Sequence, residues 1–168
     1  SPRTRGHTSG TAVPAGQPME VDIQEPKNVA LNIKALNLRF VVITSVARDD
    51  LKDEGAEHFA QTIAAIRDVS PQTKIEILIP DFSNKFESLK IVADAKPEVI
   101  SHNIETVERL SPKVRPQAEY RRSLSVLENF KKINASIFTK SSLMVGLGET
   151  LDEIVTTMKD LRAVDCDI

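Results

Sequence analysis

The sequence is poor in cysteine, in aromatic side chains and in long apolar runs. One Cys stands among 168 residues, at position 166, which excludes an intramolecular disulfide and any metal centre made only of cysteines from this chain. Trp is absent and aromatic residues make up 4% of the chain, so a surface that stacks nucleic-acid bases is not expected. The formal net charge of −2 lacks the strong positive excess of a nucleic-acid-binding domain.

The given sequence shows neither a membrane-spanning segment nor a signal peptide. No apolar run reaches the length that spans a bilayer, and the first residues lack the apolar core of a signal peptide. A single thiol is typical of a reducing compartment. We therefore expect no membrane partner and a cytoplasmic location, or a mitochondrial or plastid one in a eukaryote.

The remaining composition, 40% apolar and 27% charged residues, is that of a globular domain with a core. Residues 1–25 are rich in Ser, Thr, Gly and Pro without an apolar period, which predicts an irregular N-terminal segment ahead of one α/β domain over 26–168. Apolar runs predict strands over residues 40–43, 74–79, 99–103, 138–145 and 164–168. Helical spacing predicts helices over about 26–36, 56–69, 86–95, 121–133 and from a capping box at 150–153 onward.

Strands and helices alternate along the chain, which predicts a parallel sheet built from right-handed strand–helix–strand units. The strand segments are continuously apolar rather than alternating, which favours strands covered on both faces. An open, doubly wound sheet and a (β/α) barrel both fit this pattern. In either architecture the functional groups collect at the carboxyl ends of the strands.

Polar side chains follow two of the predicted strands. Ser45 and Asp49 come after the first, in a stretch that is able to hold an amine or a ribose and equally suits a turn with a helix cap. His102, Asn103 and Glu105 come after the third. Asn and Glu side chains there are able to bind ribose hydroxyls, whereas His102 is either a group active near neutral pH or a structural residue.

Two cations and a glycine-containing loop complete the candidates. Lys140 lies inside an apolar strand, where its ammonium group requires a polar cavity or a carboxylate partner. Arg115 offers a guanidinium suited to a carboxylate or a phosphate. Gly146 and Gly148 either permit close approach of a ligand to the backbone or form a tight strand-to-helix turn.

Many short motifs, in order along the chain, resemble one family. Among them are Ile-Thr-Ser-Val at 43–46, Arg-Asp-Asp-Leu at 48–51, Pro-Asp-Phe at 80–82, His-Asn-Ile-Glu-Thr-Val at 102–107, Val-Arg-Pro at 114–116 and the run over 140–150. From about residue 13 to the end the chain resembles lipoyl synthases, which are radical S-adenosylmethionine enzymes. The resemblance implies a partial TIM-type (β/α) barrel, here expected to be truncated at both ends.

The resemblance also implies chemistry and partners. The family inserts sulfur at C6 and C8 of a protein-bound octanoyl group, with S-adenosylmethionine and [4Fe–4S] clusters as cofactors. Its partner is an octanoylated lipoyl-carrier domain or H protein. By the same resemblance, Ser45 and Asp49 lie near the methionine end of S-adenosylmethionine, and Asn103 and Glu105 face its ribose.

The other matching positions concern the carboxylate and the adenine of S-adenosylmethionine. The resemblance implies that Lys140 or Arg115 meets the carboxylate. It implies that Met144 and the backbone from Gly146 to Glu149 flank the adenine.

The chain departs from the family in the loop that binds the primary cluster. The family has Cys-Thr-Arg-Gly-Cys-x-Phe-Cys before Ala-Val, whereas this chain has Arg3, His7 and Thr11 at the cysteine positions, with one extra residue. Arg and Thr do not ligate iron in such clusters, so no primary cluster is expected. The family's auxiliary-cluster cysteines would precede residue 1, and its C-terminal serine ligand would follow Ile168. A reading-frame error confined to residues 9–12 would explain this local difference.

Three hypotheses follow from the sequence. The first is a lipoyl synthase core fragment, inactive in sulfur insertion because the cluster cysteines are missing. The second is a Schiff-base lyase with Lys140 as the nucleophile. The third is a non-catalytic remnant that binds S-adenosylmethionine or a lipoyl-carrier domain.

Overall fold

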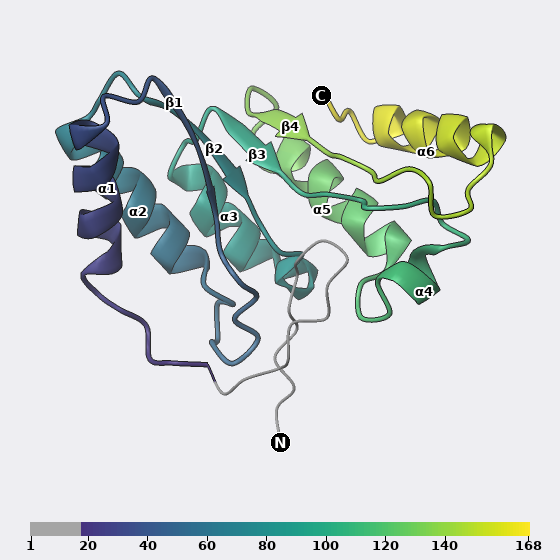
Figure 1. Cartoon of the computed structure of the whole chain (residues 1–168), viewed down its shortest axis with the longest axis horizontal. Coiled ribbons are helices and arrows are strands. Elements are labelled where there is room, and N and C mark those ends of the chain that lie inside the picture. The colour runs from purple at the N-terminus through teal and green to yellow at the C-terminus, as the bar shows by residue number, and fades with distance from the viewer. Residues whose placement is uncertain (1–17) are drawn as a thin grey trace.

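The computed structural model describes residues 18–168, in which four parallel strands form one sheet (Figure 1). The strands are β1 (Phe40–Thr44), β2 (Lys74–Leu78), β3 (Val99–Ser101) and β4 (Phe138–Lys140). The helices are α1 (Glu25–Ala35), α2 (Ala56–Val69), α3 (Phe86–Asp94), α4 (Ser111–Val114), α5 (Tyr120–Ile133) and α6 (Leu151–Ala163), with a short 3₁₀ turn η1 (Phe82–Asn84).

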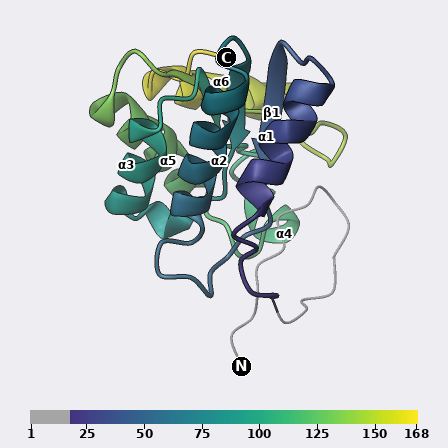
Figure 2. The ribbon, with the colours of Figure 1, turned by 90° about the vertical axis from the view of Figure 1, so that its left-hand side faces the viewer.

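Helices α1, α2, α3 and α5 stand in a row on one face of the sheet (Figures 1 and 2). Helix α6 lies beyond β4, where Leu161 joins a smaller apolar cluster with residues of α5. The Tyr120 hydroxyl at the start of α5 donates to Asp160 Oδ2 of α6 at 2.9 Å. Within residues 18–168, no helix has both the length and the apolar composition that a membrane span requires.

The order of the strands decides between the two predicted architectures. Each strand pairs in parallel with the next strand along the chain, in the order β1-β2-β3-β4. A doubly wound sheet reverses its strand order at a switch point, whereas a (β/α) barrel adds its strands in sequence. The sheet is therefore an arc of a (β/α) barrel, as the second alternative predicted.

The prediction that the strands are covered on both faces fails at the outer strands β1 and β4. Side chains alternate between the faces of a strand, and those of Val41, Ile75 and Ile100 point to the helices. On the opposite face Phe40, Val42 and Phe138 keep 51%, 53% and 56% of their surface exposed in the described structure. Continuous apolar runs also occur where strands face a barrel interior, so this pattern alone does not indicate two helical layers.

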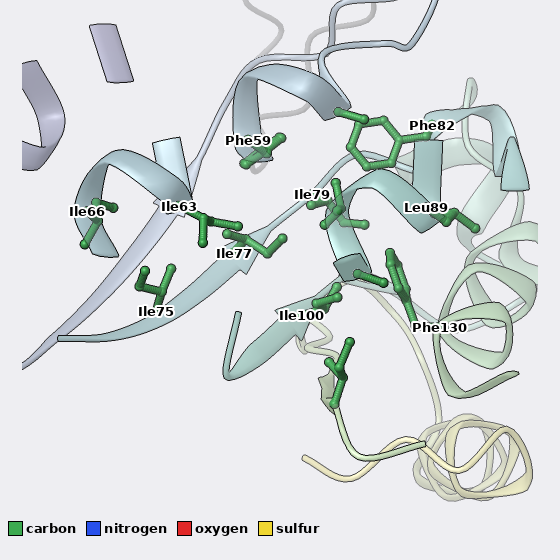
Figure 3. Close-up of a cluster of buried hydrophobic side chains, with 14 of the residues drawn as sticks. Phe59, Ile63, Ile66, Ile75, Ile77, Ile79, Phe82, Leu89, Ile100 and Phe130 are labelled. Carbon is green, nitrogen blue, oxygen red and sulfur yellow. The ribbon is translucent and has the colours of Figure 1, made fainter. Parts of the chain in front are cut away.

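The main core lies between the sheet and its helices (Figure 3). Ile63 and Ile66 of α2 meet Ile75 and Ile77 of β2, all with at most 1% of their surface exposed. Burial of such side chains contributes about 1.5–3 kcal/mol each. This packing fixes β1 to β3 against the helices and so holds their carboxyl ends in place.

Two strands end at least two residues earlier than predicted, and one predicted strand is absent. Strand β3 ends at Ser101 and β4 at Lys140, because the chain then leaves the ladder and pairs through one isolated bridge between Glu105 and Leu143. Residues 164–168 form no strand, although the Asp167 and Ile168 amides donate to the Thr139 carbonyl oxygen at 3.1 Å. Helix α4 was not predicted, since four residues are too few to show a period.

The remaining boundaries agree closely with the pattern. Helix α1 begins at Glu25, with Pro26 in its first turn, and α2 spans the predicted residues 56–69. The predicted capping box is present at the start of α6. Most of the predicted irregular segment, residues 1–17, lies outside the described residues.

Candidate functional site

The carboxyl ends of β1, β2 and β3 surround a small, open cavity, which we call the strand-end cavity. Its walls come from the residues after each strand and from the end of α4. Its lining residues are Thr44, Ser45, Leu78, Ile79, Pro80, His102, Asn103, Glu105 and Arg115. Five residues considered from sequence are therefore brought together from three segments: Ser45, His102, Asn103, Glu105 and Arg115.

The sequence reasoning did not select the apolar wall formed by Leu78, Ile79 and Pro80. Leu78 ends β2 and the other two residues follow it, so their position after a strand is the signal that could have found them. An apolar wall beside a few polar groups is typical of a site for a small molecule.

Arg115 reaches the cavity from the end of α4. Its Nη1 donates to the carbonyl oxygens of Asn103 at 2.9 Å and Ile104 at 3.5 Å, and it lies 3.5 Å from Ser123 Oγ. Burial lowers the pKa of Arg115 from its ordinary value, and the nearby Glu105 carboxylate opposes that change. The guanidinium is thus a partly desolvated cation, which strengthens its attraction for an anionic ligand.

The backbone around Glu105 is unusual and firmly held. Glu105 has a φ of 64°, in the left-handed region that few side-chain-bearing residues adopt. Its amide donates to the Ser142 carbonyl at 3.0 Å, and its carbonyl accepts from the Met144 amide at 2.8 Å. These bonds turn the Glu105 side chain to the wall of the strand-end cavity.

Ser45 and Asp49 lie in the loop after β1. The Ser45 hydroxyl donates to the Val46 carbonyl at 3.0 Å, and Ser45 lines the cavity. Asp49 does not line it. Its neighbours Arg48 and Asp50 form a two-bond ion pair at 2.8 Å for each bond, which raises the pKa of Arg48 and lowers that of Asp50.

Lys140 does not line the strand-end cavity, and its ammonium group is paired. Lys140 Nζ lies 2.9 and 3.2 Å from the two carboxylate oxygens of Glu76 on β2. Ser101 on β3 donates to the same carboxylate at 2.7 Å. The predicted carboxylate partner is therefore confirmed. Glu76 itself was missed, although a carboxylate within the apolar strand 74–79 invites the same argument as Lys140.

The loop over residues 146–149 is closed on itself, outside the cavity lining. Gly146 and Gly148 have φ values of 95° and 100°, which favour glycine. The Glu149 carboxylate accepts the amides of Gly146 and Leu147, and the Gly146 bond is the main cause that lowers its pKa. Met144 precedes this loop and also lies outside the lining. The geometry is that of a tight turn ahead of α6.

The donor set does not fit a [4Fe–4S] cluster. Arg3, His7 and Thr11 lie outside the described residues. Cys166, the single thiol, is buried, has its Sγ 3.7 Å from the Thr139 carbonyl, and has its pKa raised mainly by that burial. Within residues 18–168 no three side chains of His, Cys, Asp or Glu are grouped to hold a metal.

Comparison with known proteins places the chain in a superfamily. Residues 6–161 match the radical SAM superfamily. Lipoyl synthase of Caldicellulosiruptor saccharolyticus is 56% identical over 92% of this chain and 54% of that protein. The lipoyl synthase of Geobacillus kaustophilus is 54% identical over 94% of this chain and 53% of that protein. The lipoyl synthase of Staphylococcus haemolyticus is 50% identical over 94% of this chain and 51% of that protein. The chain thus spans about half the length of the curated relatives it matches.

Solved structures agree with the fold. Methylornithine synthase (PylB) superposes with a TM-score of 0.68 at 14% identity, over 89% of this chain and 43% of that chain, which is a likeness of fold alone. The family match confirms the resemblance seen in the motifs. The chain therefore belongs to the radical SAM superfamily, and the relatives that it matches along about half of their length are lipoyl synthases.

Proposed function

We propose that this chain is a lipoyl synthase-type radical SAM protein whose strand-end cavity binds S-adenosylmethionine. The observation that supports it most is the meeting of Ser45, Asn103, Glu105 and Arg115 in one cavity at the carboxyl ends of the strands. The activity that belongs to such a site in a full-length relative is sulfur insertion at C6 and C8 of an octanoyl group. The octanoyl group would be carried by a lipoyl-carrier domain or H protein.

Each residue has a part in holding the ligand. The Glu105 carboxylate accepts from the ribose hydroxyls, and the Asn103 amide both donates to them and accepts from them. The Ser45 hydroxyl faces the methionine amine. Arg115 offers two parallel N–H groups to the methionine carboxylate, a geometry that lysine lacks.

We assign Lys140 to the ion pair with Glu76 rather than to ligand binding. Its ammonium group is held by a carboxylate that is only 6% exposed, and removal of the lysine would leave that charge buried alone. A paired ammonium also has no free lone pair for attack on a carbonyl, which weighs against the Schiff-base hypothesis. Arg115 is accordingly the residue proposed to meet the carboxylate.

The chain as given is proposed to bind but not to insert sulfur. In this superfamily S-adenosylmethionine supplies the hydrogen-abstracting chemistry once a reducing cluster is present. This chain has one cysteine, and a [4Fe–4S] cluster takes three or four thiolates. What remains to the chain is to bind and orient the nucleoside and the methionine carboxylate.

Calorimetry or ligand-observed NMR with S-adenosylmethionine and adenosine tests the proposal. About three hydrogen bonds without a cluster anchor give an expected Kd on the order of high micromolar to millimolar for the unmodified chain. Arg115→Gln should weaken S-adenosylmethionine binding about tenfold and leave adenosine binding unchanged, because only S-adenosylmethionine has a carboxylate.

Lys140→Met is the matched control, since it removes a cation from the same sheet edge but outside the cavity lining. It should affect both ligands equally. A loss specific to S-adenosylmethionine in Lys140→Met, with Arg115→Gln unaffected, would assign the carboxylate to Lys140 instead. Absence of binding of both ligands to the unmodified chain would refute the binding proposal.

A further inference from the structure

A buried chain of polar groups links the ends of β2 and β3 to Arg115 through α5. His102 and Ser123 each keep only 1% of their surface exposed. His102 Nδ1 lies 3.1 Å from the Ile79 carbonyl oxygen, and its Nε2 lies 3.0 Å from Ser123 Oγ. Ser123 Oγ in turn lies 3.5 Å from Arg115 Nη1.

The donors and acceptors in this chain have one consistent direction. A carbonyl oxygen only accepts, so His102 Nδ1 carries the proton. In the neutral ring Nε2 then accepts, and the Ser123 hydroxyl directs its proton to Nε2. The Ser123 oxygen consequently turns its lone pairs to Arg115 Nη1, an arrangement that attracts the guanidinium.

A doubly protonated His102 would reverse the hydrogen bond between His102 and Ser123. Nε2 would donate to Ser123 Oγ, and the serine proton would point away from the ring, so that the oxygen would share its lone pairs between His102 and Arg115. The nearby charges nearly balance, because Arg115 and Arg122 face the carboxylates of Glu105, Asp81 and Glu119. Burial of the ring, with 1% of the residue exposed, is what disfavours the charged state.

We propose that His102 and Ser123 are positioning residues for Arg115, and that the neutral Nδ1-protonated ring of His102 sets the placement of the guanidinium in the strand-end cavity through the Ser123 hydroxyl. The inference rests on the proposed function in one respect: that function names S-adenosylmethionine as the ligand of Arg115. The ordering of Arg115 is a property of the chain without any ligand. His102 is thereby neither a proton donor to a ligand nor an isolated core residue.

The first test uses nitrogen NMR on the unmodified chain without ligand. The ¹⁵N shifts of His102 at pH 7 should report a neutral ring protonated at Nδ1. The Arg115 guanidinium N–H groups should exchange slowly with water. Protonation at Nε2, or on both nitrogens, would overturn the inference before any variant is made.

The second test removes the serine hydroxyl. Ser123→Ala should speed exchange or rotation of the Arg115 guanidinium about tenfold, as expected for the loss of one buried hydrogen-bond contact. Ser123→Thr, which keeps the hydroxyl, should restore slow exchange. Ser88→Ala removes another buried helical hydroxyl, on α3 and outside the cavity lining, and should leave Arg115 unchanged.

The third test adds ligand and forms a double-mutant cycle. Ser123→Ala should weaken S-adenosylmethionine about fivefold and leave adenosine unchanged, and it should add no loss in the Arg115→Gln background. Additive losses, or equal losses for the two ligands, would show that Ser123 acts independently of Arg115. If neither ligand binds the unmodified chain, the proposed function fails, while the ligand-free spectra still decide the positioning of Arg115.

Discussion

Tyr120 gives a spectroscopic test at the scale of a single residue. It is the one tyrosine of a chain without Trp, so the absorbance of phenolate reports this residue alone. Burial of the ring, together with the nearby Asp160 carboxylate, raises its pKa to about 12. The protonated form is the one favoured in the folded state.

We expect the absorbance midpoint of Tyr120 in the folded chain near pH 12, above the ordinary value of 10.0. Between those values the unfolded chain loses a proton that the folded chain retains, so the free energy of unfolding falls as pH rises, by about 1.4 kcal/mol per pH unit. Asp160→Asn should lower the midpoint only part of the way, because burial is the largest cause. A midpoint near 10 with an unchanged circular dichroism spectrum would contradict the prediction.

Sequence was a good guide to residues that follow strands and a poor guide to what their side chains do. Asn103, Glu105 and Arg115 reach one cavity because parallel strands end at the same edge. The carboxylate partner of Lys140 was foreseeable in kind, since an ammonium group within an apolar strand requires either a carboxylate or a polar cavity. That this partner is Glu76 depends on strand register, a long-range property that no local pattern encodes.

Helix α6 offers a test at the scale of one element. The Thr150 hydroxyl accepts from the Glu153 amide at 3.3 Å, and the Glu153 carboxylate accepts from the Thr150 amide at 2.8 Å. Arg109 also binds Glu153, and this contact is the main cause that lowers the Glu153 pKa to about 2. The Glu153 carboxylate at the start of α6 therefore stays ionised in mild acid.

Thr150→Ala should lower the free energy of unfolding by about 1 kcal/mol, the usual cost of losing an N-cap side chain. Thr156→Ala, at an exposed position of the same helix, should leave stability nearly unchanged or raise it slightly through better helix propensity. Urea titration followed by circular dichroism measures both. Equal effects of the two substitutions would show that the capping box does not hold the helix.

Helices other than α4 were predicted to within one or two residues, whereas the predicted β4 was five residues too long. Helix spacing is local, and Phe59, Ile63 and Ile66 mark the buried face of α2 directly. Strand length is decided by the partner. Leu143 and Val145 continue an apolar run, yet the chain beyond Lys140 bonds with Glu105 in an irregular segment rather than with β3.

At the scale of the whole molecule, the helix-free face of the sheet should promote association. Phe40, Val42 and Phe138 are exposed there on the two outer strands, and exposed apolar side chains mediate contacts between proteins. We expect oligomers or aggregates in analytical ultracentrifugation at micromolar concentration. Phe138→Lys should reduce them without changing the circular dichroism spectrum.

Met158→Lys is the control for that prediction, because Met158 is similarly exposed on α6, at 55%. It should leave association unchanged. A monodisperse monomer that unfolds cooperatively would contradict the prediction and show that the exposed face is tolerated.

Reconstitution with iron and sulfide tests whether the chain is able to hold a [4Fe–4S] cluster. Incubated anaerobically with iron and sulfide, the chain should acquire no stoichiometric [4Fe–4S] cluster, because it has one cysteine and that thiol is buried. Visible absorption and iron analysis measure the outcome. A variant with Arg3→Cys, His7→Cys and Gly10→Cys restores three cysteines at the family's spacing and should gain a cluster. A full cluster in the unmodified chain would overturn the assignment.

The sequential ladder from β1 to β4 has a consequence for the order of folding. Every strand finds its partner in the next strand and helix unit along the chain, so no contact in the sheet waits for a distant segment. Chains emerge from the ribosome N-terminus first. This sheet can consequently grow one unit at a time during synthesis, each new strand adding to an edge that its predecessor has just exposed.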